Sequence, residues 1–255
     1  MRIPWATLLL TAAVLAVYAF SSGGQLYPDS GAVAQGAFGF SNPFGLLFHL
    51  FFHIGARHLV GNLLPLVAFA MVLEITLSGR HMLSVFFVSG VLAALLFSLL
   101  NPSSFLAGAS AGVAGLMGAA ALARPKWAVV LLVAVPVLSS FVALPFLAAF
   151  TQASFEELGD QSAALSQEAG ALAAQGQAER AAAVQAQADT LADALLQQAG
   201  AQAAEEKAVP DFFVHLAGAL IGAAYVLLFL SSRVHDGFDE LAPLVEGLLG
   251  RRAKQ

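Results

Sequence analysis

The sequence predicts an all-α membrane protein with six transmembrane helices and a helical hairpin outside the membrane, between the fifth and sixth helices. Three observations predict this fold class. The 255 residues are 59% hydrophobic and only 11% charged, whereas soluble domains carry about 25% charged residues. The apolar residues form long blocks, as helices that cross a bilayer require. A single long polar block, residues 151–208, separates the last two of them.

The composition also excludes several classes of protein. The low charge and the mean hydropathy of +0.80 exclude an ordinary cytosolic enzyme. The chain has no cysteine, which rules out disulfides, a thiolate zinc site and a cysteine nucleophile. The net charge of −5 argues against nucleic acid as a partner.

Six apolar segments are expected to be helical, because backbone amides in lipid must be satisfied within the segment itself. An alternative for the first segment is a secretory signal peptide that ends near Ala19. The six segments are Trp5 to Phe20, Gly45 to Val72, Met82 to Leu100, Ser110 to Ala123, Trp127 to Phe150 and Phe212 to Ser231.

The basic residues predict the orientation, since cytoplasmic loops are enriched in Lys and Arg. With six spans, one side of the membrane holds Arg2, Arg80, Arg124, Lys126, Arg233, Arg251, Arg252 and Lys254. The other side holds only Arg57, Arg180 and Lys207. Both termini are therefore expected in the cytoplasm. The lack of an Arg- and Ser-rich transit peptide favours a bacterial cytoplasmic membrane.

The polar block has the pattern of two amphipathic helices. Residues 151–208 contain 20 Ala, 10 Gln, nine acidic and two basic residues, a net charge of −7 that leaves +2 for the rest of the chain. A partly ordered Ala- and Gln-rich linker is the alternative. Apolar residues recur every seven positions, which favours a hairpin that turns at Gly176 on the outer face: Leu158, Leu165 and Leu172, then Val184 and Leu191.

These patterns divide the chain into a membrane core, an insertion and a tail. The core comprises residues 1–150 with helices 1–5 and residues 209–233 with helix 6, the insertion is 151–208, and residues 234–255 form a cytoplasmic amphipathic tail. Helical spacing in the tail predicts a short helix at the inner leaflet, through Leu241, Leu244, Val245, Leu248 and Leu249.

The fourth segment is too short to cross the bilayer. Its 14 residues from Ser110 to Ala123 span about 21 Å as a helix, against a hydrocarbon core of about 30 Å. Ser110 is therefore expected below the outer surface, at a helix N-terminus. The free N–H groups and the dipole there would stabilise a developing oxyanion.

Ionisable and amide side chains inside apolar spans mark function by default. The second segment carries His49, His53, His58, Asn62 and Glu74, and the last carries His215. At about 100° per residue, His58 and Asn62 share a face nearly opposite to that of His49 and His53, unless the helix breaks, for example at Gly55. We assign the first pair to a site and the second pair to hydrogen bonds with the outer loop. The glycines after His215 also fit close helix packing.

These residues resemble the rhomboid intramembrane serine proteases. The resemblance covers residues 1–150 and 209–233, and it rests on three strings. They are His49-Leu-Phe-Phe-His53-Ile-Gly-Ala-Arg-His58-Leu-Val-Gly-Asn62 with Glu74 beyond it, Gly108-Ala-Ser110-Ala-Gly112-Val-Ala-Gly-Leu-Met-Gly118, and His215-Leu-Ala-Gly218-Ala-Leu-Ile-Gly222.

The resemblance implies a six-helix rhomboid-like bundle and a serine endopeptidase that needs no metal or cofactor. Ser110 would be the nucleophile and His215 its general base. The Ser110 backbone N–H, His58 and Asn62 would form the oxyanion hole. The partners would be transmembrane protein substrates and the lipid bilayer. Structural residues near the site would be His49, His53, Glu74, Gly108, Gly112, Gly218 and Gly222.

The chain departs from the pattern of the family at four places. Phe44-Gly45 stands where many relatives have Trp-Arg, which affects loop anchoring. Ala114 replaces an aromatic that packs on the catalytic histidine, and Val214 a frequent alanine. The insertion 151–208 falls in the loop that caps the site in this family. We expect it to gate the site or to contact a substrate or partner.

Three other functions are weighed against a protease. A catalytically inactive rhomboid-like protein that binds membrane clients would usually lack the serine or the histidine. A zinc protease using His49 and His53 would need a glutamate between them, where the sequence has Leu-Phe-Phe. A transporter with a midplane site would show symmetry between its two halves, and none is evident.

Overall fold

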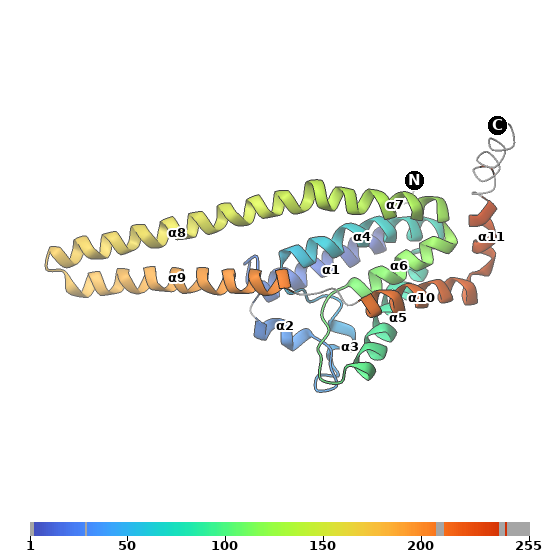
Figure 1. Ribbon diagram of the computed structural model, residues 1–255, viewed down its shortest axis with the longest axis horizontal. Coiled ribbons are helices and arrows are strands. Elements are labelled where there is room, and N and C mark those ends of the chain that lie inside the picture. Colours follow the sequence, from blue (N-terminus) through green and yellow to red (C-terminus); the bar gives the residue numbers. More distant parts are fainter. Residues whose placement is uncertain (1–2, 29, 208–211, 240–242, 244–255) are drawn as a thin grey trace.

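The structure, a computed structural model, describes residues 3–28, 30–207, 212–239 and 243, and this part of the chain is helical throughout apart from its loops (Figure 1). Its elements, in chain order, are α1 (Trp5–Ser22), α2 (Ser30–Gly36), α3 (Gly45–Phe48), α4 (Ala56–Thr76), α5 (Gly79–Leu100), α6 (Ser110–Ala123), α7 (Pro125–Leu138), the π-helix η1 (Ser139–Ala143), α8 (Leu144–Ala174), α9 (Ala178–Lys207), α10 (Phe212–Phe229) and α11 (Ser231–Asp239).

Several helices are long and apolar enough to cross a membrane, as in an integral multi-pass membrane protein. Among the described residues these are α1, α4, α5, α10 and the continuous helical stretch Pro125–Ala174. Helix α6 is apolar but has only 14 residues, with the bounds expected from the sequence. Large apolar side chains such as Phe20, Leu99 and Leu228 are exposed on these helices, as lipid contact requires. The count of six spans stays a prediction.

The expected second segment, Gly45 to Val72, is not one helix. The chain forms the single turn α3, then an irregular stretch, and α4 begins only after Gly55. Gly55 is extended, with φ −177° and ψ 172°. The irregular stretch is held in the protein by the fully buried side chains of His49, Leu50 and His53. The prediction of a continuous span is therefore wrong, and the alternative of a break at Gly55 is correct.

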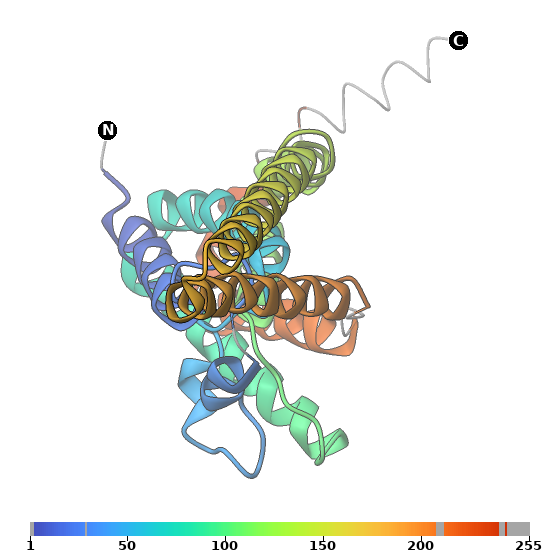
Figure 2. The same cartoon turned by 90° about the vertical axis from the view of Figure 1, so that its left-hand side faces the viewer.

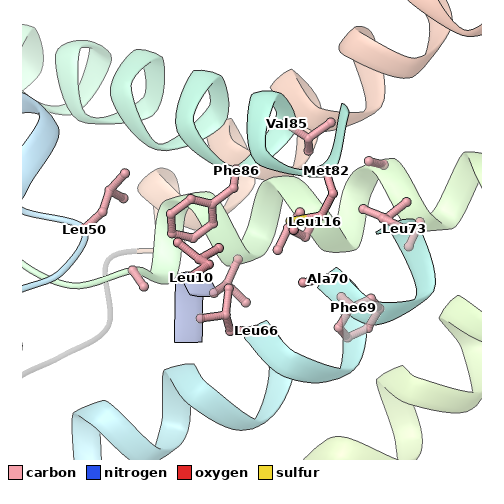
Figure 3. Close-up of a cluster of buried hydrophobic side chains, with 14 of the residues drawn as sticks. Leu10, Leu50, Leu66, Phe69, Ala70, Leu73, Met82, Val85, Phe86 and Leu116 are labelled. Carbon is pink, nitrogen blue, oxygen red and sulfur yellow. The ribbon is translucent and has the colours of Figure 1, made fainter. Parts of the chain in front are cut away.

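Helix α6 lies at the centre of the bundle and contacts α4, α5, α7, α10 and α11. Its Leu116 is fully buried in the main hydrophobic cluster (Figure 3). That cluster combines Leu66 and Phe69 of α4 with Met82 and Phe86 of α5. Between membrane helices such contacts act through close packing, because lipid tails are as apolar as leucine.

The tightest contact in the bundle joins α6 to α10. A Cβ on Gly218 would meet the backbone carbonyl of Ala111, and a Cβ on Gly222 would meet that of Gly115. Helix α6 repeats the arrangement, since a Cβ on Gly118 would meet the carbonyl of Ala219. Positions rise together along both helices, so α6 and α10 run in the same direction with backbones in direct contact.

The hairpin is continuous with the membrane helices. Helices α7, η1 and α8 follow one another without an interruption, and α8 continues beyond the bundle to the turn at Gly176, where φ is +76° (Figure 1). The boundary predicted at residue 151, between the membrane core and the insertion, therefore falls inside α8. Helix α9 returns antiparallel to α8, and Figure 2 views the pair from its tip.

Small side chains form the contact between α8 and α9. Ala169, Ala181 and Ala188 are buried, and the Ser162 hydroxyl donates a hydrogen bond of 3.0 Å to the Ala188 carbonyl. The leucines at the seven-residue spacing are half-buried. Alanine allows the two helices to approach closely but buries little apolar area.

After α10, α11 packs at the end of α6, where a Cβ on Gly237 would lie 2.8 Å from the Ala123 carbonyl oxygen. The amphipathic tail helix expected over residues 241–249 lies outside the described residues.

We expect Gly222→Ala to destabilise the protein by about 1–3 kcal/mol, the usual cost of overpacking, because its Cβ would push α10 away from Gly115. Gly61→Ala is the matched control, since Gly61 is also a helical glycine but faces open space. Thermal unfolding in detergent measures both variants. Equal stability of the two would contradict the backbone contact.

Candidate active site

Ser110 is the first residue of α6 and is half-buried. The turn before it contains Gly108, whose φ of +117° favours glycine. The Gly108 N–H donates a hydrogen bond of 2.8 Å to the His49 carbonyl. The first amides of a helix have no partner within it, so the Ser110 N–H is suited to a ligand oxygen beside its own hydroxyl.

His58 lies directly against the turn that precedes Ser110. A Cβ on Gly108 would lie 2.5 Å from Cε1 and 2.8 Å from Nε2 of the His58 imidazole. His58 stands in the first turn of α4, which packs against α6. The imidazole therefore contacts a residue only two positions before Ser110, where it can donate to an oxygen bound there.

Asn62 lies one turn further along α4 and is buried. Its Nδ2 donates a hydrogen bond of 2.9 Å to the His58 carbonyl. An amide nitrogen carries two hydrogens, so this bond fixes the side chain and leaves its second N–H as a further donor on the His58 face.

His215 is half-buried near the start of α10. It shares a face with Gly218 and Gly222, which are three and seven positions further on. Since Gly218 abuts Ala111 and the two helices run in the same direction, the residue one turn before Gly218 faces the start of α6. His58 is also within electrostatic range of His215. The His58 ring and the start of α10 therefore both lie near the start of α6, and Asn62 is bonded to the backbone of His58.

His49 and His53 hold the irregular stretch before α4. Nδ1 of His49 lies 3.1 Å from the Gly45 carbonyl and 2.9 Å from that of Leu46. Nδ1 of His53 lies 3.2 Å from the Phe51 carbonyl, and its ring centroid is 5.1 Å from that of His58. Both rings contact backbone carbonyls of their own stretch, whereas the sequence predicted hydrogen bonds with the outer loop.

Glu74 does not lie near the site, so that prediction is wrong. It is more than four turns along α4 from His58, about 24 Å of helix. Its carboxylate accepts hydrogen bonds from the Ala6 N–H at 3.0 Å, and from the Thr7 N–H and hydroxyl, both at 2.7 Å. The carboxylate caps the start of α1, where a negative charge is favourable.

The predicted glycines take different parts in the structure. Gly108 admits the His58 ring, and Gly218 and Gly222 admit the backbone of α6. Gly112 admits α5, since its Cβ would lie 2.7 Å from the Phe86 ring. The glycines of α10 therefore serve packing, and that packing positions His215.

One residue beside the site was not among those predicted from the sequence. Glu205, near the end of α9, accepts a hydrogen bond from the His58 N–H and is 8% exposed. A signal for it existed, because Glu205 continues the seven-residue spacing of Val184 and Leu191 through Gln198. The apolar members of this pattern predict the hairpin, whereas its polar members at positions 198 and 205 do not by themselves indicate burial.

The chemistry available to this cluster is acyl transfer. A serine hydroxyl is a weak nucleophile until an imidazole accepts its proton, and N–H donors beside it can stabilise the oxyanion that follows. Ser110 and His215 are half-buried, so neither side chain is fully enclosed by the protein.

Comparison with models of protein families matches the chain to a known family. A family model described as Rhomboid domain matches residues 41–232, more than half of the chain. That range holds Ser110, His215, His58 and Asn62, and it also spans the hairpin. Comparisons with curated proteins and with solved structures found no match.

We expect acid to destabilise the protein through the buried histidines outside the spans. Burial lowers the pKa of His49 to about 4 and, together with His58, that of His53 to about 3. Below about pH 6.5 the unfolded chain binds protons that the folded protein does not. The free energy of unfolding therefore decreases as the pH is lowered, by up to about 1.4 kcal/mol per pH unit for each proton.

Thermal unfolding in detergent at pH 7.5 and pH 5 measures this loss. His49→Asn keeps a donor near Nδ1 but does not titrate, so its loss should be smaller than that of the wild type. His235 is exposed on α11, and His235→Asn should retain the full loss. If the stability of His49→Asn depended on pH as strongly as that of the wild type, buried His49 would not contribute to the loss of stability in acid.

Proposed function

Since the chain belongs to the rhomboid family, we propose that it is an intramembrane serine endopeptidase that cleaves transmembrane protein substrates. The observation that carries the proposal is the register of α6 against α10. Gly218 abuts Ala111, so the two half-buried groups Ser110 and His215 belong to adjacent, parallel helix ends.

In the proposed reaction, His215 removes the proton of the Ser110 hydroxyl as the oxygen attacks the carbonyl carbon of the scissile peptide bond. The tetrahedral intermediate collapses when the imidazolium protonates the leaving nitrogen, and the C–N bond breaks. Water, deprotonated by the same imidazole, then attacks the acyl ester. The C–Oγ bond breaks as the imidazolium returns this proton to the Ser110 oxygen, which releases the carboxylic acid product. General acid–base catalysis of this kind contributes about 10²–10⁴-fold.

The proposed oxyanion hole consists of the Ser110 N–H and the side chains of His58 and Asn62. Its support is the contact of the His58 ring with Gly108 and the bond that fixes Asn62 to the His58 carbonyl. Donors held in advance need no reorganisation as charge develops, and each contributes about 3–4 kcal/mol to catalysis. His49 and His53 would stabilise the irregular stretch that precedes the helix carrying His58 and Asn62.

We propose that the site opens toward the outer face of a bacterial cytoplasmic membrane, with both termini in the cytoplasm. The asymmetry of the basic residues supports this orientation. Helix α6 is too short to reach both surfaces, which leaves Ser110 below the outer one, where polar side chains can line a path for water.

We further propose that the hairpin recruits or gates substrates. It continues from the helices that follow α6 and ends at Lys207, shortly before His215. Its net charge of −7 would favour substrates with basic residues outside the membrane.

The catalytic roles are tested with the full-length protein in detergent or liposomes. Cleavage of a fluorogenic transmembrane substrate and labelling by a fluorophosphonate should both be lost in Ser110→Ala, because no other group replaces the nucleophile. His215→Ala should lower cleavage by about 10³-fold or more, and His58→Ala by about 10²–10³-fold. Ser103 is an exposed serine in the loop before α6, and the control variant Ser103→Ala should have the activity of the wild type.

Retained cleavage in Ser110→Ala or His215→Ala would overturn the mechanism. A folded wild-type protein that neither cleaves nor reacts with the fluorophosphonate would favour an inactive relative that binds membrane clients. Loss of activity with a chelator, while Ser110→Ala remained active, would favour a metalloprotease.

The hairpin's role is tested by shortening it. Deleting Leu158–Ala171 and Glu179–Ala192 removes two heptads from each helix, so the pairing of α8 with α9 and the turn at Gly176 are retained. We expect the fluorophosphonate rate to stay constant and the KM for a transmembrane substrate with a basic outer segment to rise. An unchanged KM would show that the hairpin does not contact substrate.

A further inference from the structure

Glu205 links the hairpin to the start of α4. Its carboxylate accepts a hydrogen bond from the backbone N–H of His58, 147 positions earlier in the chain. The side chain is almost fully buried, although α9 carries mostly exposed polar residues. A buried carboxylate is costly unless its oxygens are satisfied, and this hydrogen bond joins the end of α9 to the first turn of α4.

The start of α4 lacks a cap of its own. Its N-cap is Gly55, which has no side chain to accept the amides of the first turn. The Ala56 N–H bonds to the Leu26 carbonyl at 3.0 Å, and the Leu59 N–H to the Gly55 carbonyl at 3.0 Å. The His58 N–H, between them, is satisfied by Glu205. An anion at this end of a helix also interacts favourably with the helix dipole.

Gly55 provides the room for this carboxylate. A Cβ at position 55 would meet the Oε2, Cδ and Oε1 atoms of Glu205. The backbone there is extended, a conformation that any residue adopts. Glycine is needed at this position for space, because a side chain would take the place of the carboxylate.

The hairpin presents Glu205 from its packed face. Val184, Leu191, Gln198 and Glu205 recur every seven residues on α9, and the last two are buried. Glu205 also precedes His215 by only ten positions. One side chain thus joins the helix that carries His58 to the segment that leads into the helix that carries His215.

We propose that Glu205 is a positioning residue, which caps α4 from the hairpin and thereby holds the His58 imidazole beside Ser110. The inference rests on the proposed function of Ser110, His215 and His58. In this role the insertion completes the oxyanion hole from outside the membrane core. A displacement of a catalytic group by about 1 Å costs roughly 10²-fold in rate, so a frayed first turn of α4 should reduce turnover.

The first test is Glu205→Ala in the full-length protein. We expect kcat for a fluorogenic transmembrane substrate and the rate of fluorophosphonate labelling to fall about 10- to 100-fold, with little change in KM. Glu205→Gln keeps an acceptor oxygen and should retain most of the activity. Asp193→Ala is the matched control, since it removes an exposed carboxylate from the same helix and should match the wild type.

The second test moves the cap from Glu205 to position 55. Serine is among the best N-cap residues and tolerates the extended backbone found there. We expect the double variant Gly55→Ser with Glu205→Ala to recover most of the turnover lost in Glu205→Ala. Recovery would not follow if Glu205 only held the hairpin in place, because a serine at position 55 would cap α4 without restoring the lost link to α9. A double variant as slow as Glu205→Ala would therefore overturn the proposal.

Hydrogen–deuterium exchange of the peptide that covers residues 55–62 tests the cap without relying on activity. Exchange should increase in Glu205→Ala and return toward the wild-type level in the double variant. Unchanged exchange in Glu205→Ala would refute the cap, and increased exchange with wild-type kcat would refute the positioning role. If the wild-type protein proved inactive while the variants still showed these differences in exchange, the proposed protease function would be wrong and the cap would be confirmed.

Discussion

The backbone contact between α6 and α10 is the interaction on which the rest of the structure depends. Apolar side chains gain nothing by leaving lipid for a similar protein interior, so membrane helices associate through close packing. Here glycines remove the Cβ atoms that would separate the two backbones. A slip by one turn would move α10 about 5.4 Å along α6, and His215 would no longer face the start of α6. The glycines therefore determine the geometry of the site without taking part in its chemistry.

Two glutamates that lie at opposite ends of α4 each cap the start of a helix. Glu74, near the end of α4, caps the start of α1, and Glu205 of the hairpin caps the start of α4. Neither helix has an N-cap side chain of its own, since Pro4 and Gly55 stand at those positions. Long-range capping ties segments that are distant in sequence to fixed helix ends. For this reason the acidic hairpin is part of the architecture around His58, although its composition sets it apart from the membrane core.

Local patterns predicted some features and could not predict others. The bounds of α6 followed from an apolar run that ends at Arg124-Pro125, and Gly176 marked the hairpin turn. The sequence left two alternatives before α4, a continuous helix or a break, because hydropathy does not distinguish a buried irregular stretch from a helix. Glu74 and Glu205 were misplaced or missed, since a carboxylate looks alike in sequence whether it caps a helix or faces water. Their partners lie 68 and 147 positions away.

The sequence by itself determined the membrane class and the family, and it supplied the candidates for the chemistry, because each depends on composition, order and short spacing. Only the tertiary structure decided which of them meet. The register of α6 and α10 brings His215 to the start of α6, the break at Gly55 turns His58 toward Gly108, and Glu205 joins the hairpin to α4. These relations depend on backbone approach and on helix ends being satisfied across the bundle, and neither leaves a periodic signal in one chain.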